Sequence, residues 1–457
     1  MIDPDELGRT DKIDLDDGTA ATIAESAALA RRRRLGIAMG SGWEDSATAT
    51  AAFLTALRCG VRAFKGGVSV AAAGNPILRH GWGRGERLDD ALARAGAARA
   101  SGDGDEVPVV VVIGGGAAAA PATAIHATWD GWAGGVTTDA GRRLPEGDGM
   151  PLAGVVAGAI AVSEAFQAAK GIALAARRDA GVSLWRPDLD WRDADGRGAS
   201  LAYLPSALWL LGVGHLGQAN AWAIGSLPYG HDPGVCIGLV DPERAVTANL
   251  DTGLLLAAGD VGRSKARAVA RELESRGLAT FISERRFGAG FAGDATEPAM
   301  ALAGFDKPEP RRSLEAAGLA YAVDAGLGRG ARYLDIVLQS FPGSRRAADA
   351  FPEAPARSPG DLAAAPAYAA AIRELEARGM SRDAAACGVA ELAGRTAGAA
   401  FVGAVAGALG VADLLRHLHG GVRLEAVSIS LADAAFARTA PNRLPAPPNS
   451  GFVRAGT

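Results

Sequence analysis

A glycine-rich turn in the second half of the chain has the residue types and spacing of a nucleotide-binding loop. The segment Gly212-Val-Gly214-His-Leu-Gly217 follows an apolar run at residues 207–211 and opens a helical run at residues 216–226. Glycines let the backbone approach phosphate groups, and the free amides and dipole of a helix N-terminus favour negative charge. The order strand, turn and helix is more specific than the glycine spacing alone. We predict that phosphate groups bind at this turn.

An acidic residue follows the next apolar segment. Asp241 comes directly after residues 235–240, at about the 20-residue distance from the turn that a ribose-binding acid has in nucleotide-binding folds. A tight turn and a surface carboxylate would explain the same residues, but strand, turn, helix, strand and acid all occur in order. We therefore predict an adenine-nucleotide site, and we expect His215 to be a turn residue and not a base.

Two polar residues further along the chain distinguish ATP from NAD. Asn249 precedes a leucine, and Lys265 ends a Gly-x-x-Lys segment that starts at Gly262. An amide at Asn249 suits ribose and triphosphate groups, and Lys265 supplies a mobile cation for phosphate charge as pyrophosphate departs. An NAD-dependent oxidoreductase would explain the glycines and Asp241 but neither of these residues, so the pattern favours ATP.

These ordered motifs resemble the ThiF/MoeB-like ubiquitin-activating enzyme superfamily, whose pattern is an acid, Asn-Leu and then Gly-x-x-Lys. The resemblance spans about residues 201–432 and includes the apolar helical run that begins at Phe401. It implies an adenylyltransferase that uses ATP and Mg²⁺, with Asp324 in the position of the family's magnesium-binding aspartate. The duplicated single chain resembles the bacterial activating enzymes of ubiquitin-like conjugation operons, some of which are linked to antiviral defence.

One position departs from the family pattern. Family members commonly carry an arginine shortly after Asn-Leu, whereas this chain has Asp251 there. Family dimers also take an arginine from the N-terminal helix of the partner half, and the four arginines at residues 31–34 precede the first half of this chain. We hypothesise that one of them reaches the γ-phosphate; a solvated helix end is the alternative interpretation.

Two α/β patterns follow one another, so the expected fold class is α/β, with two Rossmann-like halves forming a pseudo-dimer. Residues 154–164 align with residues 403–413, and six of these eleven positions are identical. Gly40-Ser-Gly42 also parallels the turn at residues 212–214. Chance resemblance between Ala/Gly-rich helices is the alternative, but the common order of elements favours an internal duplication.

The first half lacks the complete glycine pattern and any counterpart of Asn249 and Lys265, so we expect it to be degenerate and inactive. The expected boundaries are 1–180 for this half, 181–200 for a linker, 201–440 for the active adenylation domain with a mobile insertion at 340–397, and 441–457 for a tail. Much of the insertion is rich in Pro and Ala, which suits a surface excursion.

Alternating apolar and helical runs would position the chemical groups. We expect strands at residues 35–39, 68–73, 107–113, 207–211, 235–240, 320–323 and 334–338. We expect helices at residues 23–34, 46–57, 87–100, 152–170, 216–226 and 263–276.

Composition argues against several other classes of protein. The chain has 457 residues and a formal net charge of −4, and residues 31–34 are its one large basic block, so we expect no nucleic-acid partner. The apolar runs are interrupted by polar residues and the acidic N-terminus lacks the pattern of a signal peptide, so we expect no membrane contact and a cytoplasmic location. Three separated cysteines argue against a disulfide framework and a paired-cysteine zinc site.

Cys387 is the candidate for covalent chemistry. Activating enzymes that feed a conjugation pathway pass the adenylated partner to a cysteine as a thioester. Cys236 lies in an apolar strand and Cys59 ends an apolar helix, whereas Cys387 lies near Arg382 and Arg395, which would favour a thiolate. A buried helix cysteine between alanines is the alternative.

The expected mechanism is attack of the C-terminal carboxylate of a ubiquitin-like protein on the α-phosphate of Mg-ATP, then thioester formation and transfer to a conjugating enzyme. The catalytic residues would be Cys387, Lys265 and Asp324, with Asp324 as metal ligand. The nucleotide-binding residues would be Gly212, Gly214, Gly217, Asp241, Asn249 and Lys265.

Three alternative functions are adenylation of a sulfur-carrier protein without thioester transfer, a catalytically dead scaffold, and an NAD-dependent oxidoreductase. A homodimer would be compatible with each enzymatic function.

Overall fold

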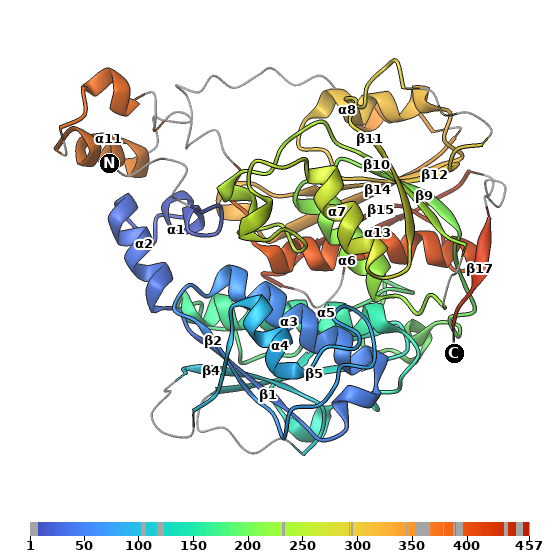
Figure 1. The fold of residues 1–457 in the computed structure, drawn as a ribbon, viewed down its shortest axis with the longest axis horizontal. Helices are drawn as coiled ribbons and strands as arrows, with labels where there is room; N and C mark the ends of the chain where they lie inside the picture. The colour runs from blue at the N-terminus through green and yellow to red at the C-terminus, as the bar shows by residue number, and fades with distance from the viewer. Residues whose placement is uncertain are drawn as a thin grey trace.

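The chain folds into two α/β halves, each with its own sheet, and helices of both halves lie between the two sheets (Figure 1). The computed structural model describes residues 8–101, 107–116, 123–230, 234–291, 293, 296–343, 345–351, 366–377, 379–386, 389, 396–433, 437–444 and 451–456. The expected α/β class is confirmed.

The first half contributes seven strands to one sheet. They are β1 (Leu35–Met39), β2 (Val68–Ala71), β3 (Ala98–Arg99), β4 (Val109–Ile113), β5 (Thr123–Asp130), β6 (Ala133–Thr137) and β7 (Ala180–Ser183). Its helices are α1 (Lys12–Asp16), α2 (Ile23–Arg32), α3 (Ala47–Ala63), α4 (Leu88–Ala95) and α5 (Pro151–Ala169).

The second half contributes eight strands to the other sheet, and β8 pairs with β17 in a separate ribbon. The strands are β8 (Tyr203–Pro205), β9 (Ala207–Leu211), β10 (Cys236–Val240), β11 (Ala279–Ser283), β12 (Met300–Ala303), β13 (Tyr321–Leu327), β14 (Asp335–Pro342), β15 (Leu424–Ser430), β16 (Arg438–Pro441) and β17 (Phe452–Arg454). The helices are α6 (His215–Ser226), α7 (Lys265–Glu274), α8 (Pro308–Arg312), α9 (Ala347–Ala350), α11 (Pro366–Ala377) and α13 (Ala400–Leu418).

The two sheets have the same strand order, which supports the predicted duplication. The first is ordered β3-β2-β1-β4-β5-β6-β7 and the second β11-β10-β9-β12-β13-β14-β15-β16. In both sheets the first five strands are parallel and the strands that follow are antiparallel. The second sheet therefore repeats the first with one strand added at its antiparallel edge.

The repeated glycines of the two long apolar helices have a packing function. A Cβ atom on Gly154 or Gly158 of α5 would lie 2.1 or 2.2 Å from a carbonyl oxygen of α3. The equivalent glycines of α13 face α6 in the same way: a Cβ on Gly403 would lie 2.3 Å from His215, and one on Gly407 would lie 2.5 Å from the Ala219 backbone. Only glycine permits these close contacts, so both copies of the motif serve helix packing.

Several sequence-based boundaries need correction. The predicted helix at residues 87–100 ends at Ala95, because Gly96 adopts a left-handed conformation (φ 82°), and the chain then forms β3. Strand β7 lies where a connecting segment was expected, and Phe341 of the expected insertion is a buried residue of β14. Most of the Pro/Ala-rich stretch, residues 352–365, lies outside the described residues.

The described part of the insertion packs on the N-terminal arm of the first half, formed by α1 and α2. Buried apolar side chains of the arm and of residues 368–389 form one cluster, which includes Leu15, Ile23, Tyr368 and Leu375. Glu374 accepts a hydrogen bond from the backbone N–H of Ile23 at 3.1 Å. A segment of the second half is thus held by the first half.

Two helices in the described part of the chain, α5 and α13, are long and apolar enough to cross a membrane. In each helix, 89% of the most apolar 18-residue stretch is buried inside the protein. Both helices lie at the contact between the halves, so their apolar character is explained by core packing.

Candidate functional site

The glycine-rich turn connects β9 to α6 as predicted. Gly212 has φ +79°, which favours glycine, and a Cβ on Gly217 would lie 1.9 Å from the Gly212 carbonyl oxygen. No heavy atom lies within 4 Å of a Cβ built on Gly214, and within the described residues no side chain caps the first turn of α6. The N-terminus of α6 therefore presents backbone amides without a side-chain acceptor.

Asp241 stabilises this turn. Its carboxylate accepts hydrogen bonds from the backbone N–H of Val213 and of Glu243, both at 2.8 Å. Burial raises the pKa of Asp241, while these hydrogen bonds oppose the rise. The residue predicted to bind ribose thus also joins the turn to the segment after β10.

Asn249 and Lys265 come from the segment that follows Asp241, and the charge of Lys265 opposes the rise in the pKa of Asp241. The side chain of Asn249 accepts a hydrogen bond from the Val246 N–H at 3.0 Å and so fixes a short helical turn. Lys265 starts α7, is buried, and forms an ion pair with Glu243 at 2.6 Å. Its hydrogen bond lowers the pKa of Glu243, and the charges of Arg286 and Lys307 lower it further. Lys265 thus pairs with Glu243, and the charges of two further cations also act on this carboxylate.

Asp324 lies on β13, opposite the last residue of β12. It is fully buried, and its Oδ1 has no hydrogen-bond partner. Burial raises the pKa of Asp324 to about 7, and the nearby charge of Arg311 partly opposes this rise. The Nε of Arg311 lies 3.5 Å from Oδ1, and its guanidinium also donates to the Phe305 and Ala325 carbonyls. Asp324 is thus a carboxylate with unused acceptor capacity.

Within the described residues, this oxygen of Asp324 accepts no hydrogen bond and its one contact is the ion pair with Arg311, so it fits a divalent cation. The part of the chain described here contains no group of three or more His, Cys, Asp or Glu residues that could hold a metal. A cation at Asp324 would therefore depend on phosphate and water oxygens for its other ligands, which is the usual arrangement for Mg²⁺.

Three contacts join these residues into one site. A Cβ on Gly212 would lie 3.4 Å from both Gly304 and Phe305, which follow β12. The Phe305 carbonyl oxygen accepts a hydrogen bond from the Nε of Arg311 at 3.1 Å, and Arg311 in turn forms an ion pair with Asp324. The structure thus brings the glycine-rich turn, Asp241, Lys265 and Asp324 to the carboxyl edge of the parallel strands, and Asn249 lies in the segment that follows Asp241.

Two arginines of this region have no signal in the sequence. Arg311 comes from α8, which the hydrophobic pattern did not indicate. Arg9 comes from the N-terminal arm, where its backbone carbonyl accepts from Gly398 at 3.2 Å. Burial lowers the pKa of His215, at the start of α6, to about 3, and the charge of Arg9 lowers it further. No local signal could have found either residue, because only the tertiary fold places them here.

The four arginines at residues 31–34 do not act as one group. Arg33 is buried, forms an ion pair with Asp14 at 2.7 Å, and lies over the Phe166 ring. Arg31 and Arg32 are exposed at the end of α2. A structural role is therefore clear for Arg33, and the hypothesis that one of the four reaches the γ-phosphate stays a prediction.

The first half contacts the loop after Asn249 through other cations. Lys65 forms an ion pair with Asp251 at 2.6 Å, and Arg58 donates to the Leu254 carbonyl at 2.7 Å. Asp251 stands where the family pattern has an arginine, so here this position binds the first half instead.

The helix of the first half that corresponds to α6 is capped by a carboxylate. Asp148 accepts hydrogen bonds from the backbone N–H of Thr48 at 2.9 Å and of Ala47 at 3.1 Å, in the first turn of α3. Burial would raise the pKa of Asp148, but the hydrogen bonds from Thr48, Ala47 and Ser46 together lower it. The position where an anion would bind is thus occupied by the chain itself.

Cys387 lies outside the described residues, so its proposed role stays a prediction. Cys59 is fully buried in α3, and burial raises the pKa of its thiol. Burial also raises the pKa of the partly exposed Cys236. Neither environment favours a thiolate.

Comparison with known proteins gives matches over both halves. Residues 34–184 match the family described as the BilD N-terminal domain, and residues 204–421 match the BilD C-terminal domain. The chain is 35% identical over 461 residues to the bacterial E1-like protein BilD of Collimonas sp. (strain OK412), a match that covers 99% of this chain and 97% of that protein.

Solved structures show more distant similarity. E. coli MccB matches with 16% identity and a TM-score of 0.34, over 52% of this chain and 62% of that chain. PaaA matches with 12% identity and a TM-score of 0.34, over 52% of this chain and 64% of that one. The match thus spans less than two thirds of the length of either structure.

Proposed function

The chain belongs to the BilD family of bacterial E1-like proteins, and from this premise we propose that its second half binds Mg-ATP and adenylates the C-terminal carboxylate of a ubiquitin-like protein. The observation that carries the proposal is the buried Oδ1 of Asp324, which accepts no hydrogen bond from the described residues, at the same edge of the sheet as the N-terminus of α6. These two features supply an acceptor for a cation and donors for phosphate at one edge of the sheet.

The residues of the site divide the work of nucleotide binding. The free amides at the start of α6 would hold phosphate oxygens, and Gly214 leaves space for them. Asp241 and Asn249 would orient the ribose while they keep the backbone of the turn in place. Mg²⁺, when bound at Asp324, would neutralise charge on the phosphates.

In the chemical step, a carboxylate oxygen of the partner attacks the α-phosphorus, and the bond between this phosphorus and the pyrophosphate oxygen breaks. Lys265 would leave Glu243 and follow the negative charge onto the departing pyrophosphate. Arg286 and Lys307 also act on Glu243, so their charges add to the positive potential there. Positioning and charge neutralisation provide the catalysis.

A second transfer completes the proposed pathway. The thiolate of Cys387 would attack the acyl carbonyl carbon, AMP would leave, and the resulting thioester would pass the partner to a conjugating enzyme. This step rests on the sequence position of Cys387 and on the family.

Two measurements test the proposal. Thermal unfolding with Mg-ATP, NAD or NADP at 100 times the dissociation constant should show stabilisation of about 2.7 kcal/mol with Mg-ATP alone. Exchange of labelled pyrophosphate into ATP should then depend on a ubiquitin-like protein with a free C-terminus. Selective stabilisation by NAD or NADP, or exchange that no such partner stimulates, would contradict the proposed adenylation.

A further inference from the structure

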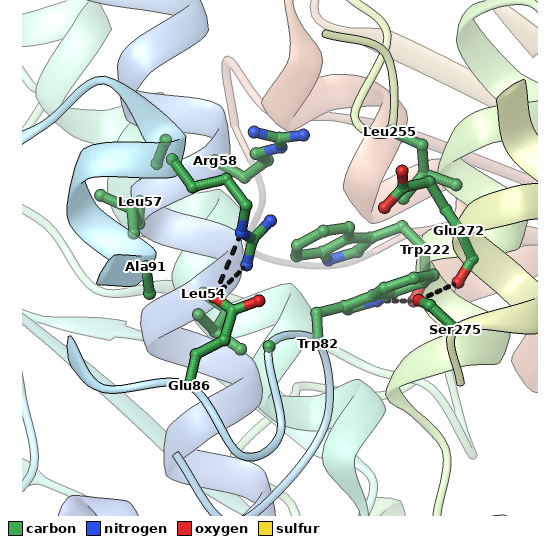
Figure 2. Close-up of a pocket in the computed structure, with 13 residues that line it drawn as sticks. Leu54, Leu57, Arg58, Trp82, Glu86, Ala91, Trp222, Leu255, Glu272 and Ser275 are labelled. Atoms are coloured by element: carbon green, nitrogen blue, oxygen red, sulfur yellow. Dashed lines mark hydrogen bonds and ion pairs between the residues drawn. The ribbon is translucent and has the colours of Figure 1, made fainter. Parts of the chain in front are cut away.

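A cavity lies between the two halves, and no residue of the glycine-rich turn lines it (Figure 2). Its volume is about 220 Å³. Its walls come from α3 and the segment 82–95 of the first half, and from α6, α7 and Leu255 of the second. An engineered protein cavity of about 150 Å³ accommodates benzene, so this cavity has room for a ligand of at least that size.

Two stacked tryptophans form an apolar wall of the cavity. The rings of Trp82 and Trp222 lie 5.2 Å apart with an angle of 11° between their planes. Trp82 donates its indole N–H to the Trp222 carbonyl at 3.0 Å, and Trp222 donates its own to the Thr55 hydroxyl at 2.9 Å. Both polar ring atoms are satisfied, so the stack offers only apolar surface, as do the neighbouring Leu54 and Leu57.

The charged residues of the cavity leave one cation without a counter-ion. Glu86 forms an ion pair with Arg94 at 2.9 Å, and Glu272 forms an ion pair with Arg271 at 2.9 Å. Arg58 donates its Nε–H to the Leu254 carbonyl, but within the described residues no carboxylate lies within 4.0 Å of its guanidinium.

The surroundings of Arg58 favour an added negative charge. Burial lowers the pKa of Arg58 to about 9, and the nearby charges of Arg62 and Arg94 lower it further, while Glu272 opposes them. An anion next to this guanidinium would relieve the repulsion between the arginines and compensate the buried charge.

We propose that this cavity binds a small carboxylate with a flat apolar body, whose anionic group lies at Arg58 and whose body lies against the Trp82–Trp222 stack. A body of about one aromatic ring fits the volume of the cavity. Because the walls belong to both halves, a bound ligand would link the two halves. The proposal does not depend on adenylation, since none of these residues belongs to the nucleotide site.

Benzoate is a suitable probe because it combines one aromatic ring with one carboxylate. Titration of the full-length protein should produce a saturable change in tryptophan fluorescence and a rise in melting temperature. Benzamide, which has the same shape without the charge, should bind at least tenfold more weakly. Inorganic phosphate, which has the charge without the ring, should also bind at least tenfold more weakly. Absence of saturable benzoate binding, or equal binding of either control compound, would overturn the proposal.

The chain offers a matched pair of arginines to locate the site. Arg58→Met should weaken benzoate binding at least tenfold, whereas Arg62→Met should not, because Arg62 makes the same kind of contact, to the Leu256 carbonyl, but does not line the cavity. Equal loss in both variants would show that only the contact between the halves matters for binding, and it would overturn the proposal.

A second variant, Ala91→Met, fills the cavity from α4 and keeps Arg58. It should abolish benzoate binding, and it tests the site even if Arg58→Met fails to fold. Unchanged binding in Ala91→Met would show that the probe binds elsewhere.

Discussion

The N-termini of α3 and α6 show how two copies of one framework have diverged. Each helix follows the third strand of its sheet in spatial order, β1 or β9, and each packs against a long apolar helix through paired glycines. In the first half, however, the carboxylate of Asp148 caps the helix, whereas no side chain of the described residues caps the start of α6. The fold supplies a helix N-terminus in both halves, and side chains outside the helix decide whether it is free for a ligand.

The parallel strands show a second difference. Asp324 lies opposite Ala303, the last residue of β12, and Ala127 lies opposite Ile113, the last residue of β4. Register thus places an alanine in the first half where the second half has a buried carboxylate. We infer that the second half alone binds nucleotide, and the predictions below test this contrast.

The largest expected effect concerns Asp324. Asp324→Asn keeps the shape of the side chain but removes the charge that would hold Mg²⁺, so pyrophosphate exchange should fall by about 100-fold or more. Asp148→Asn in the first half is the control and should leave the exchange rate within about twofold. If the Asp324→Asn protein exchanged pyrophosphate at the normal rate, the buried carboxylate would not be what makes the second half active.

The titration of Asp324 should affect stability in the metal-free protein. Its pKa in the folded state is raised from 3.8 to about 7, so the folded protein binds this proton more tightly than the unfolded chain. Stability should therefore fall as the pH rises from about 4 to 7, by a few kcal/mol at about 1.4 kcal/mol per pKa unit. Denaturant unfolding of Asp324→Asn over the same range should lack this fall; a parallel pH dependence in both proteins would show that other groups cause it.

Alanine substitutions at one glycine in each half allow the loop after β9 to be compared with the loop after β1. A Cβ on Gly217 would lie 1.9 Å from the Gly212 carbonyl oxygen, and one on Gly40 would lie 2.2 Å from the Gly115 carbonyl oxygen. Alanine at either position should destabilise the protein by about 1–3 kcal/mol, which chemical denaturation can measure. Only Gly217→Ala should also abolish the thermal shift with Mg-ATP. Loss of that shift in Gly40→Ala alone would reverse the roles of the two halves.

The smallest effect concerns the cap of α3. Asp148→Asn should cost about 1 kcal/mol at neutral pH, because a charged cap is replaced by a neutral one at a helix N-terminus. The pKa of Asp148 is lowered in the folded state, so this contribution is present above about pH 4 and is lost as the pH falls through the folded-state pKa. Urea unfolding of both proteins at pH 7 and pH 3 should show the difference shrinking; a constant difference would mean that the charge does not contribute.

Local sequence patterns predicted the parts of the site that lie close together along the chain. The strand-turn-helix from Ala207 to Ser226 occurs almost as expected, since apolar runs and glycine spacing are local properties. The repeated glycines of α5 and α13 also indicated two similar halves. Strands β5, β6, β12 and β15 were missed, because short or mixed runs become strands only when neighbours complete the sheet.

The sequence by itself determined the glycine-rich turn, the acid after β10 and the duplicated α/β pattern, because each depends on spacing within a short segment. Tertiary structure alone decided that Arg311 lies beside Asp324, that Lys65 pairs with Asp251 and that Asp148 closes the first copy of the helix N-terminus. The charges of these pairs meet across sequence separations of up to 186 residues. Packing of the two halves fixes the contact between Lys65 and Asp251, and packing within one half fixes the other two, so tertiary structure decides the difference between a free and an occupied site.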